Sequence, residues 1–299
     1  MAVSHSFNTH LQRANLGLLK LLGHLPLRWL RALGWLWGHV LYAAVVPRRR
    51  IALINWRLCF PAQPPDEQHR AVRAHFVAFA QAWLDRSWLW EAAPEVLASR
   101  LRLTGVVSAL DGDAPTVLFA PHFVGLDAGW TALTLHVPRT FCTLYAPQKN
   151  KVMDGWIAQG RRRFGAPEVV SKYQGAKPVV AAIRAGKPLY LLPDMDQGMN
   201  DAVWATLFGQ QAATLTSLPR MARLGRAQVL SVTSRITPSG YDVELHPVWS
   251  DYPGPDLQAD VQRMNHELES LVATMPEQYY WVHKRFKTRP PGEPSVYRR

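Results

Sequence analysis

The sequence predicts an α/β fold: a single layered α/β domain with a mixed, mostly parallel central sheet and a helical N-terminal membrane-associated extension. Composition is the first reason, because 48% of the 299 residues are hydrophobic and 19% are charged, a balance that disordered chains lack. The second reason is a change of pattern near residue 113, after which short apolar runs alternate with helical stretches. We expect residues 1–50 to form the membrane-associated helical segment and residues 51–299 the α/β domain.

The N-terminal segment is apolar and has a basic border. The stretch Leu16–Val46 is rich in Leu, Trp and Val, and its longest run without a charged residue, Ala32–Val46, has 15 residues. A helix that crosses a bilayer needs about 20 apolar residues. We therefore expect a helix that lies in, or dips into, an anionic leaflet, with Arg48–Arg50 at its border. The alternative is an ordinary buried helical hairpin that breaks at Pro26.

The rest of the chain divides into one long helix followed by alternating strands and helices. Residues 66–91 are typical of one amphipathic helix that begins after two prolines. Strands are expected at residues 116–120, 139–144, 188–192, 227–234 and 241–246. Further helices are expected at residues 126–135, 153–164, 176–185, 215–224 and 257–275. This order favours a mostly parallel sheet with at least one antiparallel pair near the C-terminal end.

The charge of the chain indicates an anionic partner. It has 34 Lys and Arg against 22 Asp and Glu, a net charge of +12, together with 12 Trp. Such a surplus attracts nucleic acid, anionic lipid or an acidic protein, and the tryptophans suit a membrane–water interface. Two cysteines cannot build a disulfide framework or a Cys-based zinc site. The motifs of dinucleotide-binding proteins, P-loop NTPases, Gly-x-Ser-x-Gly hydrolases and His-Glu-x-x-His peptidases are absent from the sequence.

One segment carries candidate chemistry, residues 120–127, with the sequence APHFVGLD. His122 follows the end of an apolar strand and precedes a helical pattern, and α/β sheets place ligand chemistry at such strand ends. Asp127 could hold one imidazole nitrogen and fix the tautomer of a general base. Because residues i and i+5 diverge by about 140° within a helix, His122 must precede the helix, and Gly125 would permit the bend. The alternative is a strand-end histidine that caps a helix.

Residues 121–127 resemble the His-x4-Asp/Glu signature of the glycerolipid acyltransferase superfamily. Five further stretches, in order along the chain, resemble a more specific family: Arg48–Pro61, Leu144–Phe164, Leu192–Gly198, Phe208–Thr214 and Pro276–Gly292. With them the chain is similar to the lipid A secondary (late) acyltransferases, the lauroyl and myristoyl transferase family of Gram-negative bacteria. It departs from the usual family pattern at Asp127, Pro121 and Ala146, where Glu, Asn and Arg are the more frequent residues.

The resemblance implies an O-acyltransferase in which His122 is the general base and Asp127 its orienting carboxylate. It also implies functional roles for Arg161 and Asp194. Arg161, or backbone N–H groups at the start of the helix after Gly125, could stabilise the oxyanion of the tetrahedral intermediate. No Ser or Cys lies beside His122, so direct transfer without an acyl-enzyme is expected.

The basic residues near Arg161 are candidates for binding substrate. The run Arg161–Arg163 could bind lipid phosphates, or it could be a solvated helix end. The expected substrate-binding residues are Arg161, Asp194, Arg162, Arg163 and Lys149. Asp194 and Asp196 lack further ligand signals, so we expect no metal, and no cofactor is expected either.

The resemblance also implies the substrates and the place of action. The donor would be an acyl-carrier-protein thioester, and the acceptor the 3-hydroxyl of an acyl chain on a lipid A precursor. The protein would work on the cytoplasmic face of the inner membrane, where its charge would attract anionic lipid and the acidic carrier protein rather than nucleic acid. Two alternatives stay open: an acyltransferase for a glycerol, sugar or amino-acid lipid, and a non-enzymatic basic membrane-binding protein.

Overall fold

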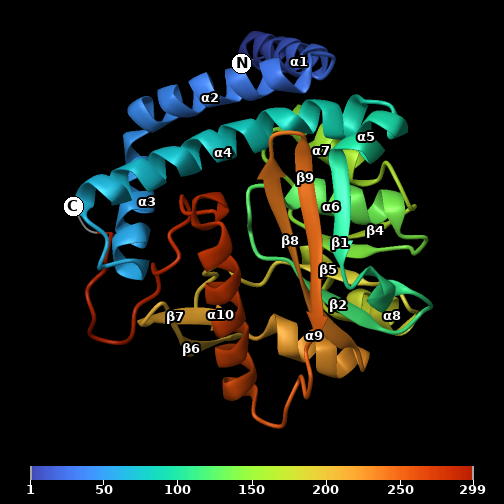
Figure 1. The fold of residues 1–299 in the computed structure, drawn as a ribbon, viewed down its shortest axis with the longest axis vertical. Helices are drawn as coiled ribbons and strands as arrows, with labels where there is room; N and C mark the ends of the chain where they lie inside the picture. The colour runs from blue at the N-terminus through green and yellow to red at the C-terminus, as the bar shows by residue number, and fades with distance from the viewer. Residues whose placement is uncertain (1, 298–299) are drawn as a thin grey trace.

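A computed structural model describes residues 2–297 of the chain, and the side chains of residues 12–297. A seven-stranded sheet lies between two groups of helices, and a long helix, α4, crosses one end of it (Figure 1). The helices are α1 (Ala2–Leu22), α2 (Leu27–Ala44), α3 (Val46–Cys59), α4 (Pro65–Glu91), α5 (Pro94–Arg100), α6 (Leu126–His136), α7 (Lys151–Arg161), α8 (Lys177–Arg184), α9 (Ser217–Gly225) and α10 (Leu257–Thr274), with 3-10 turns η1 (Val107–Leu110), η2 (Lys172–Gln174) and η3 (Pro276–Gln278). The strands are β1 (Leu101–Gly105), β2 (Thr116–Phe119), β3 (Cys142–Tyr145), β4 (Glu168–Ser171), β5 (Leu189–Leu191), β6 (Ala202–Leu207), β7 (Gln210–Leu215), β8 (Gln228–Thr237) and β9 (Gly240–Val248).

The sheet has the strand order β1-β9-β8-β2-β5-β3-β4. Neighbouring strands are parallel except β8 and β9, which form an antiparallel hairpin in which Thr237 pairs with Gly240. This arrangement confirms the predicted mixed, mostly parallel sheet and the antiparallel pair near the C-terminal end. Strands β6 and β7 form a separate two-stranded antiparallel sheet.

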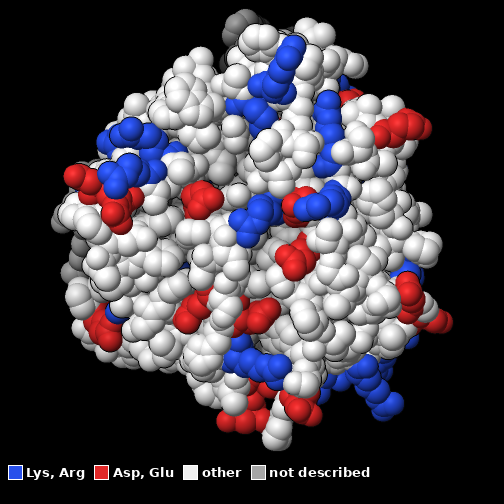
Figure 2. All heavy atoms as spheres, viewed as in Figure 1, with Lys and Arg blue, Asp and Glu red and all other residues white. Residues whose placement is uncertain are grey.

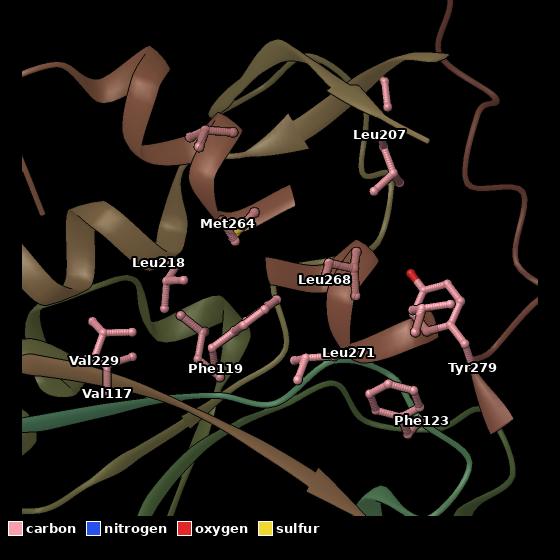
Figure 3. Close-up of a cluster of buried hydrophobic side chains, with 14 of the residues drawn as sticks. Val117, Phe119, Phe123, Leu207, Leu218, Val229, Met264, Leu268, Leu271 and Tyr279 are labelled. Carbon is pink, nitrogen blue, oxygen red and sulfur yellow. The ribbon is translucent and has the colours of Figure 1, made fainter. Parts of the chain in front are cut away.

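Alternate residues of the central strands face opposite layers, as the pleat of a strand requires. Val117 and Phe119 of β2 belong to a core shared with α8, α9 and α10, which Figure 3 shows in close-up. Leu118 and Ala120 belong to a second core on the other face, which includes residues of α4, α6 and α7. Because both faces are covered, β2 is buried throughout and presents only its carboxyl end to a ligand.

The N-terminal helices α1 and α2 are separated by a turn before Pro26, the break that the helical-hairpin alternative expects. Helix α2 lies along α4 (Figure 1), and a Cβ built on Gly34 or Gly38 would lie within 3 Å of α4 backbone atoms. Arg31 of α2 also forms an ion pair of 3.0 Å with Asp85, which is fully buried in α4. Within residues 2–297, no helix combines the length and the apolar character that crossing a membrane would require.

Four strands lie outside the predicted elements, namely β1, β4, β6 and β7. Strands β1 and β4 are the two edges of the large sheet and have exposed or half-buried positions, so their sequences lack a continuous apolar run. The strand predicted at residues 139–144 begins at Cys142 instead. The reason is that both neighbouring strands begin opposite Cys142, which pairs with Glu168 of β4 and Leu189 of β5.

Candidate active site

The site begins where two neighbouring parallel strands end. Strands β2 and β5 pair with Phe119 opposite Leu191. Each strand continues through one more residue and a proline, and the residue after the proline is His122 in one case and Asp194 in the other. Equal extensions from a paired register bring the two side chains together. The sequence-predicted His122 and Asp194 are therefore neighbours at the carboxyl edge of the sheet.

The imidazole of His122 is held by Asp194 through two contacts. Nδ1 lies 2.7 Å from Oδ1 of Asp194, and the backbone N–H of His122 donates to Oδ2 over 3.0 Å. Because a carboxylate can only accept here, Nδ1 carries the proton and Nε2 is left with its lone pair. The Tyr279 hydroxyl donates to the same Oδ2 over 3.0 Å. This arrangement fixes the tautomer in which Nε2 can act as a base.

Electrostatics keep Asp194 ionised although it is fully buried. Burial alone would raise the pKa of Asp194, but its electrostatic interaction with the His122 ring and the hydrogen bonds from that ring and from the His122 backbone N–H lower the pKa below the usual 3.8. Burial and the charge of Asp194 raise the pKa of Tyr279 well above 10, so its phenol stays protonated and remains a donor. The second tyrosine of this segment, Tyr280, stacks on the His122 ring with centroids 6.5 Å apart.

The carboxylate that binds the His122 ring is not the one predicted from the sequence. Asp194, rather than Asp127, accepts from Nδ1. Asp127 Oδ1 accepts from Arg161 Nε and Nη2 over 3.0 and 2.8 Å, and its Oδ2 accepts from Arg86 Nε over 2.7 Å. The physical reason is the placement of Asp127 in the first turn of α6, which packs between α4 and α7, so the arginines of those helices reach it. A catalytic role for Asp127 stays a prediction.

Arg161 is positioned by the end of α7. A Cβ on Gly160 would lie 2.3 Å from the Trp90 ring, so only glycine allows α7 to pack this closely on α4. The guanidinium of Arg161 lies over the Tyr145 ring, with its carbon 5.6 Å from the centroid. Tyr145 in turn donates its hydroxyl to Asp154. These contacts hold Arg161 in the rotamer that meets Asp127.

These residues surround a cavity of about 560 Å³. His122, Asp127 and Arg161 line it together with Arg86 of α4. Much of the remaining wall is apolar or aromatic: Phe79, Ala82, Trp83, Leu126, Trp130, Leu144, Ile157 and Leu192. The cavity therefore joins one imidazole and two guanidinium groups to a lining that suits a hydrocarbon chain.

Other predicted residues lie elsewhere. Lys149 and Arg162 are exposed and do not line the cavity, so their binding of substrate stays a prediction. Arg163 donates to the carbonyls of Leu89 and Ala92 and thereby caps the C-terminal end of α4. This contact occupies the guanidinium that we expected to bind substrate.

Position 125 requires a glycine, but not for the backbone bend expected from the sequence. Its φ of −81° is accessible to any residue, and the glycine is needed because a Cβ would lie 2.7 Å from the Ser234 carbonyl oxygen.

Asp196 lies two residues after Asp194 but has a different partner. It accepts from the backbone N–H and the hydroxyl of Thr288 and so fixes the C-terminal segment.

Sequence reasoning missed Arg86 and Tyr279 as members of the site. No local sequence pattern distinguishes Arg86 from the two other arginines of the same helix, Arg70 and Arg73, which are exposed. Tyr279 lies inside the C-terminal stretch that carried the resemblance, so its segment was found but its role was not. The C-terminal segment reaches the site because the Val124 N–H donates to the Gln278 carbonyl and the Tyr280 N–H donates to the His122 carbonyl.

An α/β sheet with a carboxylate-bound histidine at its carboxyl edge, beside arginines and an apolar cavity, is an arrangement suited to acyl transfer. The comparisons agree with this class. The family described as "Bacterial lipid A biosynthesis acyltransferase" matches residues 5–288, and the chain belongs to that family. It is accordingly an acyltransferase of lipid A biosynthesis.

Individual relatives span most of the chain. A lipid A biosynthesis palmitoleoyltransferase of Escherichia coli K12 is 30% identical and covers 94% of this chain and 92% of its own length. The myristoyltransferase of the same organism is 31% identical over 84% of this chain and 79% of its own. The lauroyltransferase is 28% identical over 94% and 93%. A 1-acyl-sn-glycerophosphate acyltransferase structure from Thermotoga maritima aligns over 82% of this chain and 97% of its own, with 14% identity and a TM-score of 0.39.

Proposed function

We propose that this protein transfers a fatty acyl chain from an acyl-carrier-protein thioester to a hydroxyl of a lipid A precursor, with His122 as the general base. The observation that carries the proposal is the imidazole at the wall of a largely apolar cavity: Nδ1 is bound to a buried carboxylate, and Nε2 has no hydrogen bond among residues 12–297. Membership of the lipid A acyltransferase family supports the class of acceptor.

The acceptor hydroxyl needs a base because its pKa lies far above neutrality. Its oxygen attacks the thioester carbonyl carbon while Nε2 of His122 takes the proton. The resulting imidazolium is stabilised by the anionic Asp194. When the tetrahedral intermediate collapses, the C–S bond breaks and the proton passes from Nε2 to the leaving thiolate. The products are an ester and a free thiol, and His122 returns to its neutral form.

The oxyanion of the intermediate needs donors, each of which contributes a few kcal/mol of stabilisation. Arg161 lines the cavity on the same side as the N-terminus of α6, which begins at Leu126. A helix N-terminus carries partial positive charge and favours an anion. These two features are the stabilising groups in the proposed mechanism.

Direct transfer is favoured over an acyl-enzyme intermediate. Cys142 is buried in β3, and burial raises the pKa of its thiol to about 12, so it is a poor nucleophile. Thr143 lines the cavity, but its hydroxyl donates to the Tyr190 carbonyl. Neither residue has a hydrogen bond to His122 among those of residues 12–297.

The N-terminal helices supply a surface for the membrane. Helix α2 exposes several large apolar side chains: Trp29, Leu33, Leu36, Trp37 and Val40 form one stripe at helical spacing, and Trp35 lies apart from it. Several groups of Lys and Arg side chains lie on the upper part of the face in Figure 2, where α2 and α4 lie, with some Asp and Glu among them. An apolar stripe with basic neighbours suits a helix lying in the headgroup layer of an anionic leaflet. This surface supports the membrane association that the resemblance implies, and we propose that the protein lies on the cytoplasmic face of the inner membrane.

The test is an assay of the purified protein with a lipid A precursor and acyl-carrier-protein thioesters of several chain lengths, read by mass spectrometry. His122→Ala should reduce transfer by roughly 10²- to 10⁴-fold, whereas His24→Ala, at an exposed histidine in the α1–α2 turn, should not. No turnover with any donor would refute the donor and acceptor assignment. Transfer to a glycerol, sugar or amino-acid lipid instead would replace the acceptor and keep the chemistry.

A further inference from the structure

Asp127 is shared by two arginines that come from helices far apart in the sequence. One oxygen accepts from Arg161 of α7 and the other from Arg86 of α4, over 2.7 to 3.0 Å. The Asp127 side chain is 4% exposed, and each arginine side chain is 21% exposed. Both arginines also lie against aromatic rings, Arg86 against Trp90 and Arg161 against Tyr145.

The cluster has a net positive charge. Burial alone would raise the pKa of Asp127, but the charges of Arg161 and Arg86 lower it to about 2. The carboxylate therefore stays ionised at any working pH, and two guanidinium groups balance one carboxylate to leave +1. Without Arg86 the cavity wall would hold a neutral Arg161–Asp127 pair, because Arg86, Asp127 and Arg161 are the Arg, Lys, Asp and Glu residues that line the cavity.

Arg86 also has hydrogen-bonding capacity in reserve. Among the hydrogen bonds of residues 12–297, Arg86 uses only Nε. A guanidinium has five N–H donors, and neither Nη1 nor Nη2 of Arg86 is a buried atom without a partner. Its terminal nitrogens therefore remain in contact with solvent or the cavity.

We propose that Arg86 is a positioning residue of the acyl-transfer site, which holds Asp127 so that Asp127 can hold Arg161 and which supplies the surplus positive charge of the cavity wall. The inference rests on the proposed function and adds a residue to it. Arg86 fixes the carboxylate from the α4 side, so Asp127 presents its other oxygen to Arg161. The oxyanion then forms beside a cluster of charge +1 rather than beside a neutral ion pair.

The experiment compares Arg86→Gln, which removes the charge, with Arg86→Lys, which keeps it. Arg86→Gln should lower kcat by roughly 10- to 100-fold, the range for losing a charge-assisted contact, with a smaller change in KM. Arg86→Lys should recover at least half of that loss on a logarithmic scale. Arg73→Gln is the matched control, because Arg73 is an exposed arginine of the same helix that lies over the Tyr42 ring. It should leave kcat unchanged.

Three results would overturn the inference. The first is an unchanged kcat in Arg86→Gln. The second is an equal loss of kcat in Arg86→Lys and in Arg86→Gln, accompanied by a lower Tm in both variants. The third is that the effects of Arg86→Gln and Asp127→Asn on kcat are strictly additive in the double variant. Residues that act through one another should be non-additive.

A crystal structure of Arg86→Gln gives a readout that does not depend on turnover. Asp127 and Arg161 should leave their present positions, and unchanged positions would refute the positioning role. If the wild-type protein fails to transfer acyl groups while this structural shift occurs, the proposed function is at fault rather than the role of Arg86.

Discussion

Replacing Asp194 by Asn tests the tautomer of His122, because the two oxygens of the Asp194 carboxylate have different hydrogen-bond donors. Oδ2 accepts from the backbone N–H of His122 and from the Tyr279 hydroxyl, while Oδ1 accepts from Nδ1. A backbone N–H can only donate, so an Asn side chain must place its oxygen at the Oδ2 position. Its NH₂ group then faces Nδ1. Nδ1 is forced to accept, the ring proton moves to Nε2, and the nitrogen that faces the cavity loses its lone pair.

The expected loss is large because the base itself disappears. The same tautomer reversal in a histidine-dependent hydrolase costs about 10⁴ in kcat, and general-base catalysis is worth roughly 10²–10⁴. We expect Asp194→Asn to lower kcat by about 10³- to 10⁴-fold. KM should change little, since Asp194 lies behind His122 and does not line the cavity. The assay is initial-rate transfer from an acyl-carrier-protein thioester, with circular dichroism and Tm as checks of folding.

Asp127→Asn is the matched comparison, because it is the same chemical change in the other buried carboxylate of the site. Asp127 contacts Arg86 and Arg161, so its loss should disturb the oxyanion region and cost about 10- to 100-fold. The reasoning fails if the order is reversed, with Asp127→Asn losing 10³-fold or more while Asp194→Asn stays within tenfold of wild type. That result would return the orienting role to Asp127.

Three further predictions concern stability, packing and membrane binding. Burial lowers the pKa of His75 from 6.5 to about 4, so between those values the unfolded chain binds a proton that the folded chain refuses, and the free energy of unfolding falls as pH falls. At pH 5 this lowers the free energy of unfolding by about 2 kcal/mol. Urea unfolding of the wild type at pH 7.5 and at pH 5 should therefore differ more than it does for His75→Gln. An equal difference in the two proteins would contradict the argument. A Cβ at Gly160 would lie 2.3 Å from the Trp90 ring, so Gly160→Ala should lower both Tm and kcat, whereas Gly155→Ala, in open space on the same helix, should change neither. Trp37→Glu on the exposed face of α2 should weaken binding to anionic phospholipid vesicles by at least tenfold in a flotation assay, and undiminished binding would argue against that face.

Local sequence patterns were sufficient to place His122 but not to choose its partner. A buried strand followed by Pro and His marks a strand end, and β2 ends as predicted at that point. Which carboxylate meets the imidazole depends on which strand lies beside β2, and strand order is a property of the whole sheet. The sequence did contain a signal for Asp194, since a second apolar strand also ends in Pro and a polar residue at the matching offset. Asp127, chosen by spacing, lies in a helix whose neighbours are two arginines.

The elements with a strong period were predicted well, and the edges were not. Helix α4 spans Pro65–Glu91 against the predicted residues 66–91, because two prolines mark its start and buried residues then recur at helical spacing from Val72 to Trp90. The edge strand β1 carries Arg102, whose guanidinium forms an exposed ion pair with Asp242 of β9. Such a strand depends on its partner for its structure, so its own residues do not predict it.

Helix α4 links the proposed membrane face to the chemistry. Gly34 and Gly38 of α2 lie against Gln81 and Val77, while the cavity is lined by α4 residues at positions 79, 82, 83 and 86. At about 100° per residue these two sets lie on nearly opposite sides of the helix. The close approach of α2 and the buried Arg31–Asp85 ion pair, next to Arg86 in the sequence, leave α2 little freedom to move separately. A membrane bound by α2 would therefore hold the cavity in a fixed orientation to the lipid surface.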